Sequence, residues 1–366
     1  MCDYYNPVKV IKTDNWLDEL NLSIEKLKIT APVIVTSPGN RRRLDLDSKF
    51  NSDSIFSDVR ANPNFEDCVN AIKFCRKNIF DGVVALGGGS AMDLAKVVMA
   101  YLCLEKPDVN ELINHKGDFP RTIPSIFLPT THGTASEVTM WGTVWNMTEK
   151  KKYSISHPEL YPTFAILDGN LTMSLPLDIS ITTVMDALSH SFEAIWNKNS
   201  NKISTKHAIK AICAIIRKID SFKTDPYNLK IRSSLLHASN LAGLAFSNTK
   251  TAAAHSISYP LTIYYGIPHG VASSICLVPL LRINKKSILS SLNIICQKNK
   301  ITFLELVNKI KSIPSDIIPY KMKNWGVCES QLDDLVEESF TYERMDNNIV
   351  DLSKNNLRYI FENVYK

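Results

Sequence analysis

The sequence lacks the features of a secreted or membrane-spanning protein. Its eight cysteines are scattered over 366 residues without a Cys-x-x-Cys pair, which predicts reduced, mostly buried thiols rather than a disulfide framework. The opening residues MCDYYNPVKVIK do not show the charged-then-apolar pattern of a signal peptide. No apolar run approaches the ~20 residues that cross a bilayer. We therefore expect a soluble, cytoplasmic protein.

A strong charge of one sign is also absent. The net charge of +5 comes from 42 basic and 37 acidic residues, and no basic stripe stands without matching acids, so nucleic acid is not an expected partner. The hydrophobic share of 45% is ordinary for a globular protein. A chain of this length suffices for about two domains, and no repeat or low-complexity linker interrupts it.

The two halves of the chain differ in pattern. Four short apolar runs predict strands: PVIVTS (32–37), GVVALG (82–87), SIFLPT (125–130) and FAILD (164–168). An amphipathic segment between the first two indicates a parallel sheet with helices on both faces. After about Pro176 the segments are long and have helical periodicity. We predict an α/β domain over 1–176 and an all-helical domain over 177–366, with a cleft between them as a favoured ligand site.

A glycine turn follows the second predicted strand. In VVALGGGSAMDLAK, three glycines and Ser90 stand between a strand and a helix. Without side chains, the backbone N–H groups can approach an anion, and the helix N-terminus adds its unpaired amides. The turn therefore predicts a pyrophosphate cradle, although its spacing is not Gly-x-Gly-x-x-Gly. The alternative is a tight turn that only packs strand against helix.

A second polar loop, LPTTHGTASEVT, follows the third predicted strand. Its threonines and Ser136 are short hydroxyl donors, which are also common in ordinary turns. Because the carboxyl ends of parallel strands meet at one edge, where ligands bind, two such loops together favour a nucleotide site.

One carboxylate and three histidines in the helical half suggest a metal site. Asp186 and His190 in DALSHSF lie four residues apart, on one face of a helix. His255 follows in TAAAHSISYP, and the turn GIPHG delivers His269. This set suits a divalent transition metal. Taken alone, DALSHSF is equally compatible with a buried polar pair.

Four motifs in consistent order resemble the iron-containing (group III) alcohol dehydrogenase family: GGGSAMDLAK, PTTHGTASEVT, DALSHSFEA and GLAFSNTKTAAAHSISYPLTIYYGIPHGVA. The resemblance extends to about residue 285 and implies a dinucleotide-binding α/β domain, a helical domain and an active site in the cleft between them. It implies that iron(II), or zinc, is held by Asp186, His190, His255 and His269. It further implies that NADPH or NADH is bound by Gly88, Gly89, Ser90, Asp93, Thr130, Thr131 and Lys152.

The chain departs from the family pattern at several positions. Tyr259 stands where the family commonly has a second histidine, so we expect this phenol to relay the proton. His132 and Ala135 stand where a small residue and a glycine are usual.

The end of the first predicted strand bears on cofactor choice. Many NAD-using members have an acid there, whereas this chain has Ser37, followed by Arg41 and two further arginines. An arginine can pair with a 2′-phosphate, which favours NADPH over NADH. The alternative is a solvated basic loop.

The motifs SEVTMWGTVWN, ISHPELYP and KTAAAHSISYPLT are similar to the phosphonoacetaldehyde reductase branch. That branch reduces phosphonoacetaldehyde to 2-hydroxyethylphosphonate in phosphonate biosynthesis. A dianionic phosphonate needs a cationic partner, and Lys250, which stands where the general family has a small residue, and His132 are the predicted substrate-binding residues. A surface position for Lys250 is the alternative.

The resemblance implies a metal-assisted hydride transfer to a small aldehyde. The expected partners are this small-molecule substrate and a second copy of the chain in a homodimer. Three alternatives remain open. They are a general short-chain aldehyde/alcohol dehydrogenase of the same family, a dehydroquinate-synthase-like lyase, and a non-catalytic binding protein. The lyase uses one acid and two histidines for its metal, so the predicted Asp and three histidines disfavour it.

Overall fold

The computed structural model describes residues 4–104, 107–146, 149, 151–341 and 344–366. The chain forms two compact units. The α/β unit comprises residues 6–131 and 135–172, and the helical unit comprises the described residues of 1–5, 132–134 and 173–366. The main boundary thus falls at 172/173, four residues before the expected 176/177, because the chain leaves the sheet before the first long helix begins at Leu177.

Six parallel strands form the sheet of the α/β unit, in the order β1-β8-β5-β4-β2-β3. Their bounds are β1 (Lys9–Lys12), β2 (Pro32–Thr36), β3 (Ile55–Phe56), β4 (Gly82–Gly87), β5 (Ser125–Pro129) and β8 (Phe164–Leu167). A separate antiparallel hairpin consists of β6 (Trp141–Asn146) and β7 (Lys151–Ser156). The parallel sheet confirms the predicted fold class.

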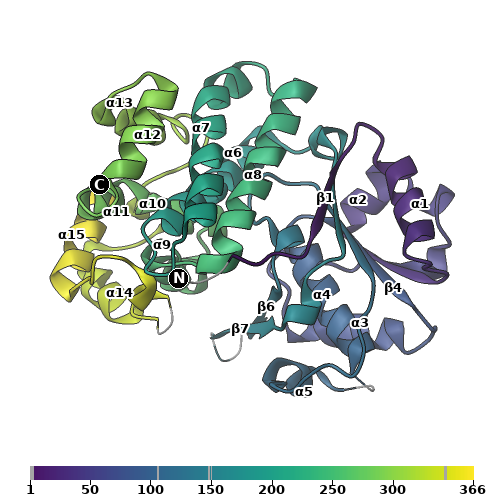
Figure 1. Ribbon diagram of the computed structural model, residues 1–366. Helices are drawn as coiled ribbons and strands as arrows, with labels where there is room; N and C mark the ends of the chain where they lie inside the picture. The colour runs from purple at the N-terminus through teal and green to yellow at the C-terminus, as the bar shows by residue number, and fades with distance from the viewer. Residues whose placement is uncertain (1–3, 105–106, 147–148, 150, 342–343) are drawn as a thin grey trace. The chain divides into compact units, whose positions relative to one another are not determined.

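Helices pack on both faces of this sheet (Figure 1). They are α1 (Trp16–Lys26), α2 (Pro38–Arg43), α3 (Phe65–Cys75), α4 (Gly89–Cys103) and α5 (Val109–Asn114). Alternate residues of β4 enter different cores: Val83 joins the core that contains α3 and α4, and Val84 joins the core that contains α1. Because successive strand side chains point to opposite faces, an apolar strand such as β4 buries both faces at once.

The helical unit contains ten α-helices in its described residues. They are α6 (Leu177–Ile195), α7 (Lys202–Thr224), α8 (Leu229–Thr249), α9 (Ala253–Tyr265), α10 (His269–Ile275), α11 (Leu277–Asn284), α12 (Leu289–Asn299), α13 (Phe303–Ser312), α14 (Leu332–Glu338) and α15 (Lys354–Tyr365). Residues 184–195 of α6 are all buried, so this part of the helix is enclosed on every side by its neighbours. A polar residue on α6 therefore needs a partner or a ligand.

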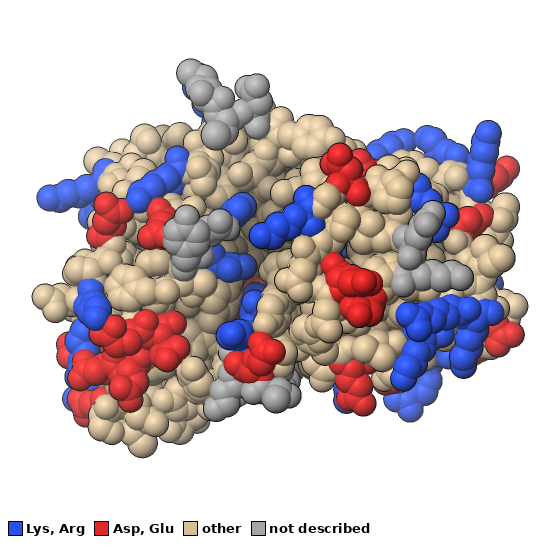
Figure 2. Space-filling view, turned by 90° about the horizontal axis from the view of Figure 1, so that it is seen from below, with Lys and Arg blue, Asp and Glu red and all other residues tan. Residues whose placement is uncertain are grey.

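The other global expectations can be compared with the described residues. Seven cysteines are unpaired and five of these are buried, while Cys2 lies outside the described residues. Within the described part of the chain, no helix has the length and apolar character needed to span a membrane. Basic and acidic side chains both appear on each unit in Figure 2.

Candidate metal and dinucleotide sites

The four predicted metal ligands come from three helices of the helical unit. Asp186 and His190 lie on α6, His255 lies on α9, and His269 is the first residue of α10. Gly266 ends α9 in the left-handed region, at φ 64°, a conformation that glycine adopts without strain. A Cβ on Gly270 would lie 2.3 Å from the carbonyl oxygen of Thr182, so a glycine lets the first turn of α10 pack directly on α6.

The distances among Asp186, His255 and His269 fit one metal ion. Oδ1 of Asp186 lies 3.5 Å from Nε2 of His255 and 3.8 Å from Nε2 of His269. Oδ2 of Asp186 lies 3.8 Å from Nδ1 of His190, whose ring stacks on that of His255 with centroids 4.4 Å apart. Two ligand atoms that are each about 2.1 Å from one ion lie roughly 3 to 4 Å apart. The structure thus groups Asp186, His255 and His269, whose ligand atoms lie within 4.8 Å of one another, and His190 lies beside Asp186.

Two residues that the sequence analysis did not single out hold these ligands in place. The carboxylate of Glu193 contacts Nδ1 of His255 and accepts a hydrogen bond from its backbone N–H at 3.1 Å. This leaves Nε2 of His255 toward Asp186, buried and without a hydrogen-bond partner among the described residues. Ser273 donates a hydrogen bond to Oδ1 of Asp186 at 2.8 Å. A carboxylate behind a metal-binding histidine is the usual arrangement at such sites.

The electrostatics of the cluster favour the ligand form of the carboxylate. Burial alone raises the pKa of Asp186, but the adjacent His190 and His269 outweigh it and lower the pKa far below its ordinary value. Burial also lowers the pKa of His255, whereas Glu193 and Asp186 raise it to a net value of about 9. Asp186 is therefore ionised, which is the form that binds a divalent cation, whereas His255 has to release a proton when a metal binds.

The glycine turn and the threonine loop are neighbours at the carboxyl edge of the sheet. Gly88 is the N-cap of α4, and a Cβ there would lie 2.9 Å from Cγ2 of Thr131. The backbone N–H of Thr130 donates to the carbonyl of Gly87 at 3.0 Å. Ser90 accepts a hydrogen bond from the backbone N–H of Asn62 at 3.1 Å. The predicted pyrophosphate residues are thus together, at the N-terminus of a 15-residue helix.

A buried lysine in the same unit organises the segment after the threonine loop. Nζ of Lys96 donates to Oγ of Ser136, to Oγ1 of Thr139 and to the carbonyl of Trp141, at 2.7–2.8 Å. Burial lowers the pKa of Lys96 to about 7, against the opposing effect of Asp93 and Glu137. Lys96 was not predicted to have a role, although it lies in the glycine-turn motif itself.

Two predicted cofactor residues lie near this lysine network. Asp93 accepts a hydrogen bond from Ser136 at 2.9 Å, and burial raises its pKa. Lys152 lies on β7 with Nζ 5.4 Å from the ring centroid of Trp145.

The residues expected to bind the adenosine end of the cofactor lie at the N-terminus of α2 and within it. Ser37 caps this helix, accepting a hydrogen bond from the backbone N–H of Asn40 at 3.2 Å. Arg41 pairs with both oxygens of Asp47, at 2.5 and 3.0 Å, and donates to Ser57. Its hydrogen bond lowers the pKa of Asp47 to about 2. A 2′-phosphate would have to compete with this carboxylate, so the contact of Arg41 with the cofactor stays a prediction.

The two predicted substrate-binding residues lie in different surroundings. Lys250 is exposed and ends α8 with φ 62°, and its carbonyl accepts a hydrogen bond from Asn197. His132 is fully buried, with its ring 6.0 Å from that of Phe222. Burial lowers the pKa of His132 to about 3, so its ring is neutral at physiological pH. The contact of Lys250 and His132 with substrate stays a prediction. The buried, neutral ring of His132 does not support an ion pair with an anionic substrate.

Tyr259, the predicted proton relay, lies on α9 one turn after His255. Its side chain is buried, and Cζ of Arg344 lies 5.0 Å from the centroid of its ring. Burial raises the pKa of Tyr259 to about 12, so the phenol keeps its proton at neutral pH. Arg344 lies beyond the motifs that the sequence analysis used.

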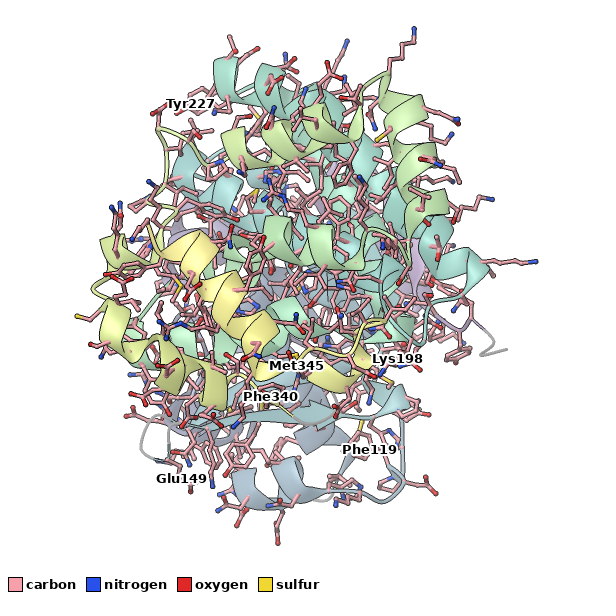
Figure 3. The ribbon with its side chains drawn as sticks, turned by 90° about the vertical axis from the view of Figure 1, so that its left-hand side faces the viewer. Phe119, Glu149, Lys198, Tyr227, Phe340 and Met345 are labelled. Atoms are coloured by element: carbon pink, nitrogen blue, oxygen red, sulfur yellow. The ribbon has the colours of Figure 1, made fainter. Side chains whose placement is uncertain are left out.

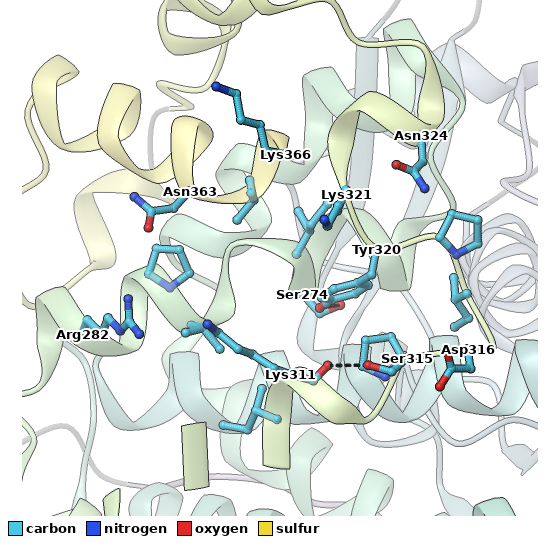
Figure 4. A pocket seen from close by; sticks show the side chains of 18 residues that line it. Ser274, Arg282, Lys311, Ser315, Asp316, Tyr320, Lys321, Asn324, Asn363 and Lys366 are labelled. Carbon is cyan, nitrogen blue, oxygen red and sulfur yellow. Dashed lines mark hydrogen bonds between the residues drawn. The ribbon is translucent and has the colours of Figure 1, made fainter. Parts of the chain in front are cut away.

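A separate pocket of about 610 Å³ lies in the helical unit and includes none of the four predicted metal ligands (Figure 4). Four basic side chains line it, those of Arg282, Lys311, Lys321 and Lys366. The hydroxyl of Tyr320 donates to Ser274 on α10 at 2.8 Å.

The fold and these two sites are typical of metal-dependent oxidoreductases that use a dinucleotide. The family model described as iron-containing alcohol dehydrogenase matches residues 7–169. The model described as Fe-containing alcohol dehydrogenase family, C-terminal, matches residues 180–365. The chain therefore belongs to the iron-containing alcohol dehydrogenase family and is an oxidoreductase.

Three relatives illustrate the range of this similarity. Long-chain-alcohol dehydrogenase 1 of Geobacillus thermodenitrificans is 30% identical over 80% of this chain and 76% of its own length. Phosphonoacetaldehyde reductase of Streptomyces viridochromogenes is 32% identical over 56% of this chain and 53% of its own length. The crystal structure of sulfoacetaldehyde reductase from Bifidobacterium kashiwanohense in complex with NAD+ is 28% identical, with a TM-score of 0.90 over 100% of this chain and 98% of that one.

These comparisons confirm the predicted family and fold. The phosphonoacetaldehyde reductase branch, by contrast, is matched over only about half of the chain.

Proposed function

We propose that this protein is an NAD(P)H-linked reductase that converts phosphonoacetaldehyde to 2-hydroxyethylphosphonate, with iron(II) or zinc held by Asp186, His190, His255 and His269. The grouping of Asp186, His255 and His269, whose ligand atoms lie within 4.8 Å of one another, supports the proposal for the metal, and His190 lies beside Asp186 on the same helix. The similarity to proteins named for phosphonoacetaldehyde and sulfoacetaldehyde supports the substrate class. Both names denote a two-carbon aldehyde with a strongly acidic group. A cytoplasmic location and a small-molecule substrate form part of the proposal.

The reaction adds a hydride to the carbonyl carbon and a proton to its oxygen, and NAD(P)H is oxidised to NAD(P)+. A divalent metal in this cluster supplies Lewis-acid polarisation of the carbonyl. The backbone N–H groups at Gly88 and Gly89 bind the pyrophosphate at the N-terminus of α4. Glu193 keeps Nε2 of His255 directed at Asp186, and Tyr259 holds a proton at its hydroxyl. These residues orient the reactants, which is the protein's main contribution in cofactor enzymes.

A general short-chain aldehyde or alcohol dehydrogenase is the second candidate. The similarity to a long-chain-alcohol dehydrogenase over 80% of the chain supports an uncharged substrate, although that protein is named for longer alcohols. The two candidates differ only in how the substrate beyond the aldehyde group is recognised.

The test measures NADPH and NADH oxidation by iron- and zinc-loaded protein with phosphonoacetaldehyde, sulfoacetaldehyde and butanal. We expect kcat/KM for phosphonoacetaldehyde to exceed that for butanal at least about tenfold, since one charged contact contributes more than 1.4 kcal/mol. Equal kcat/KM values for phosphonoacetaldehyde and butanal would favour the general dehydrogenase instead. Inactivity with every aldehyde in both metal forms would contradict the proposal as a whole.

A further inference from the structure

The connection between α14 and α15 is tied to α9, the helix that carries His255. Oγ of Ser256 donates to the carbonyl of Ser339 at 2.7 Å and accepts from the backbone N–H of Thr341 at 3.1 Å. Farther along, the side chain of Asn347 donates to the carbonyl of Thr251, just before α9 begins, at 2.9 Å. The described residues of the connection are thus anchored at two places along the same helix.

Figure 3 marks this connection with Phe340, after α14, and with Met345, which begins a short 3-10 turn over Met345–Asn347. Arg344 immediately precedes that turn and is its N-cap. The hydrogen bonds on either side of Arg344 therefore hold its backbone close to α9.

The guanidinium of Arg344 lies over a residue of the candidate site rather than against an acid. Its Cζ is 5.0 Å from the ring centroid of Tyr259, a cation–π distance. Arg344 is partly exposed and forms no ion pair with any residue that the structure describes. Its positive charge is therefore available to an anion.

Two further observations place this charge close to the metal ligands. Tyr259 follows His255 by one turn of α9, so the two side chains lie on the same face of the helix. Glu193, which contacts His255, and Arg344 both act electrostatically on the phenol of Tyr259. The guanidinium and the carboxylate behind His255 are thus both near enough to the phenol to act on it.

We infer that Arg344 binds the anionic end of the substrate while the aldehyde end faces the Asp–His cluster, and so selects two-carbon aldehydes with a tetrahedral oxyanion. This inference rests on the proposed function and names the residue that performs the recognition. A guanidinium offers two parallel N–H groups to two oxygens of a phosphonate or sulfonate. Of the residues predicted for this role, His132 is buried and neutral, and Lys250 is exposed at the end of α8.

The experiment compares Arg344→Gln and Arg344→Lys with the wild-type holoenzyme on phosphonoacetaldehyde, sulfoacetaldehyde and butanal. For Arg344→Gln we expect kcat/KM on both anionic aldehydes to fall about 10- to 100-fold, mainly through KM, because a hydrogen bond to a charged group is lost. Butanal, which has no anionic end, should lose much less, because only the effect of Arg344 on Tyr259 is removed for it. Arg344→Lys keeps the charge but loses the two parallel N–H groups. Its kcat/KM on the anionic aldehydes should therefore lie between those of the wild type and Arg344→Gln.

A binding measurement separates recognition from chemistry. Calorimetric titration with 2-hydroxyethylphosphonate should show a Kd about 10- to 100-fold weaker in Arg344→Gln. Arg282→Gln is the matched control, because it removes one exposed positive charge from the separate pocket of the same unit. It should match the wild type in both measurements.

The outcomes distinguish this inference from the proposed function. A wild-type enzyme that does not prefer anionic aldehydes contradicts the proposed function. A wild-type enzyme that prefers them, with the same preference in Arg344→Gln and in Arg344→Lys, overturns the role of Arg344. An equal loss on butanal and on the anionic aldehydes would also overturn it, since a structural role predicts that result.

Discussion

At the scale of single residues, Glu193 determines which nitrogen of His255 is available to a metal. The carboxylate is fully buried and contacts both Nδ1 and the backbone N–H of the histidine. When a metal displaces the proton of Nε2, Nδ1 keeps its proton for Glu193, and Nε2 is the ligand atom. Outer carboxylates of this kind raise the basicity of the imidazole and hold the ring in place.

Glu193→Gln should weaken metal binding about 10- to 100-fold, because the neutral amide neither raises the basicity of His255 nor holds its tautomer as firmly. Competition with a chromogenic chelator gives the Kd for Zn²⁺ without any need for activity. Glu337→Gln is the control, since this exposed residue pairs with Lys354 at the surface. A Glu193→Gln protein that binds Zn²⁺ as tightly as the control would refute the role of Glu193.

At the scale of elements, the N-terminus of α4 depends on the close approach of two loops. Neither Gly88 nor its neighbours require a positive φ, so the requirement for glycine is steric. The threonine loop leaves 2.9 Å between Cγ2 of Thr131 and the place of a Cβ on Gly88, which is closer than two carbon atoms pack.

Gly88→Ala should therefore displace Thr131 and weaken NAD(P)H binding about tenfold, a change of 1.4 kcal/mol. Fluorescence titration with NADH and NADPH measures this. Gly117→Ala is the matched control, because the nearest atom to its Cβ belongs to His115 at 3.4 Å, and it should bind as the wild type does. Unchanged affinity in Gly88→Ala would exclude the glycine turn from the cofactor site.

Lys96 links α4 to the segment that leads into β6. Lys96→Met would leave its acceptors on Ser136, Thr139 and Trp141 buried without a donor, so we expect the free energy of unfolding to fall by about 3 kcal/mol. Urea denaturation measures the change. Lys73→Met, at an exposed position of α3, is the control and should stay within about 0.5 kcal/mol of the wild type. A similar small change for Lys96→Met would show that the buried network contributes little.

At the scale of the whole molecule, the predicted metal ligands belong to one unit and the predicted dinucleotide residues belong to the other. The metal should therefore stabilise the helical unit, because its ligands come from three different helices that unfolding separates.

Zn²⁺ at 100 times its Kd adds about 2.7 kcal/mol to the folded state, which in a unit of this size raises Tm by about 5–10 °C. Asp186→Ala and His269→Ala should lose this shift and the activity together, whereas Asp351→Ala, a surface carboxylate paired with Lys198, should keep both. Calorimetry with and without chelator measures the shift. An Asp186→Ala protein that is active without metal would sink the assignment of the cluster.

Local patterns in the sequence determined the longer elements and the spacing of residues within them. Runs such as GVVALG predicted strands, and a spacing of four placed Asp186 and His190 on one helix face, because periodicity is a property of neighbouring residues. The strands β1, β3, β6 and β7 were not predicted: β3 has only two residues, and β1, β6 and β7 are partly exposed and lack the continuous apolar run of the buried strands. The unit boundary moved to 172/173 because it depends on packing rather than composition.

Only the tertiary structure decided which distant side chains meet. Glu193 contacts His255 across 62 positions of the chain, and Arg344 reaches Tyr259 from the connection before the last helix. No local pattern predicts such pairs, because their contact depends on how separate helices pack. Packing likewise buried His132 and paired Arg41 with Asp47. The sequence thus determined which residue types are available for a metal and a dinucleotide, and the fold decided which of them face each other.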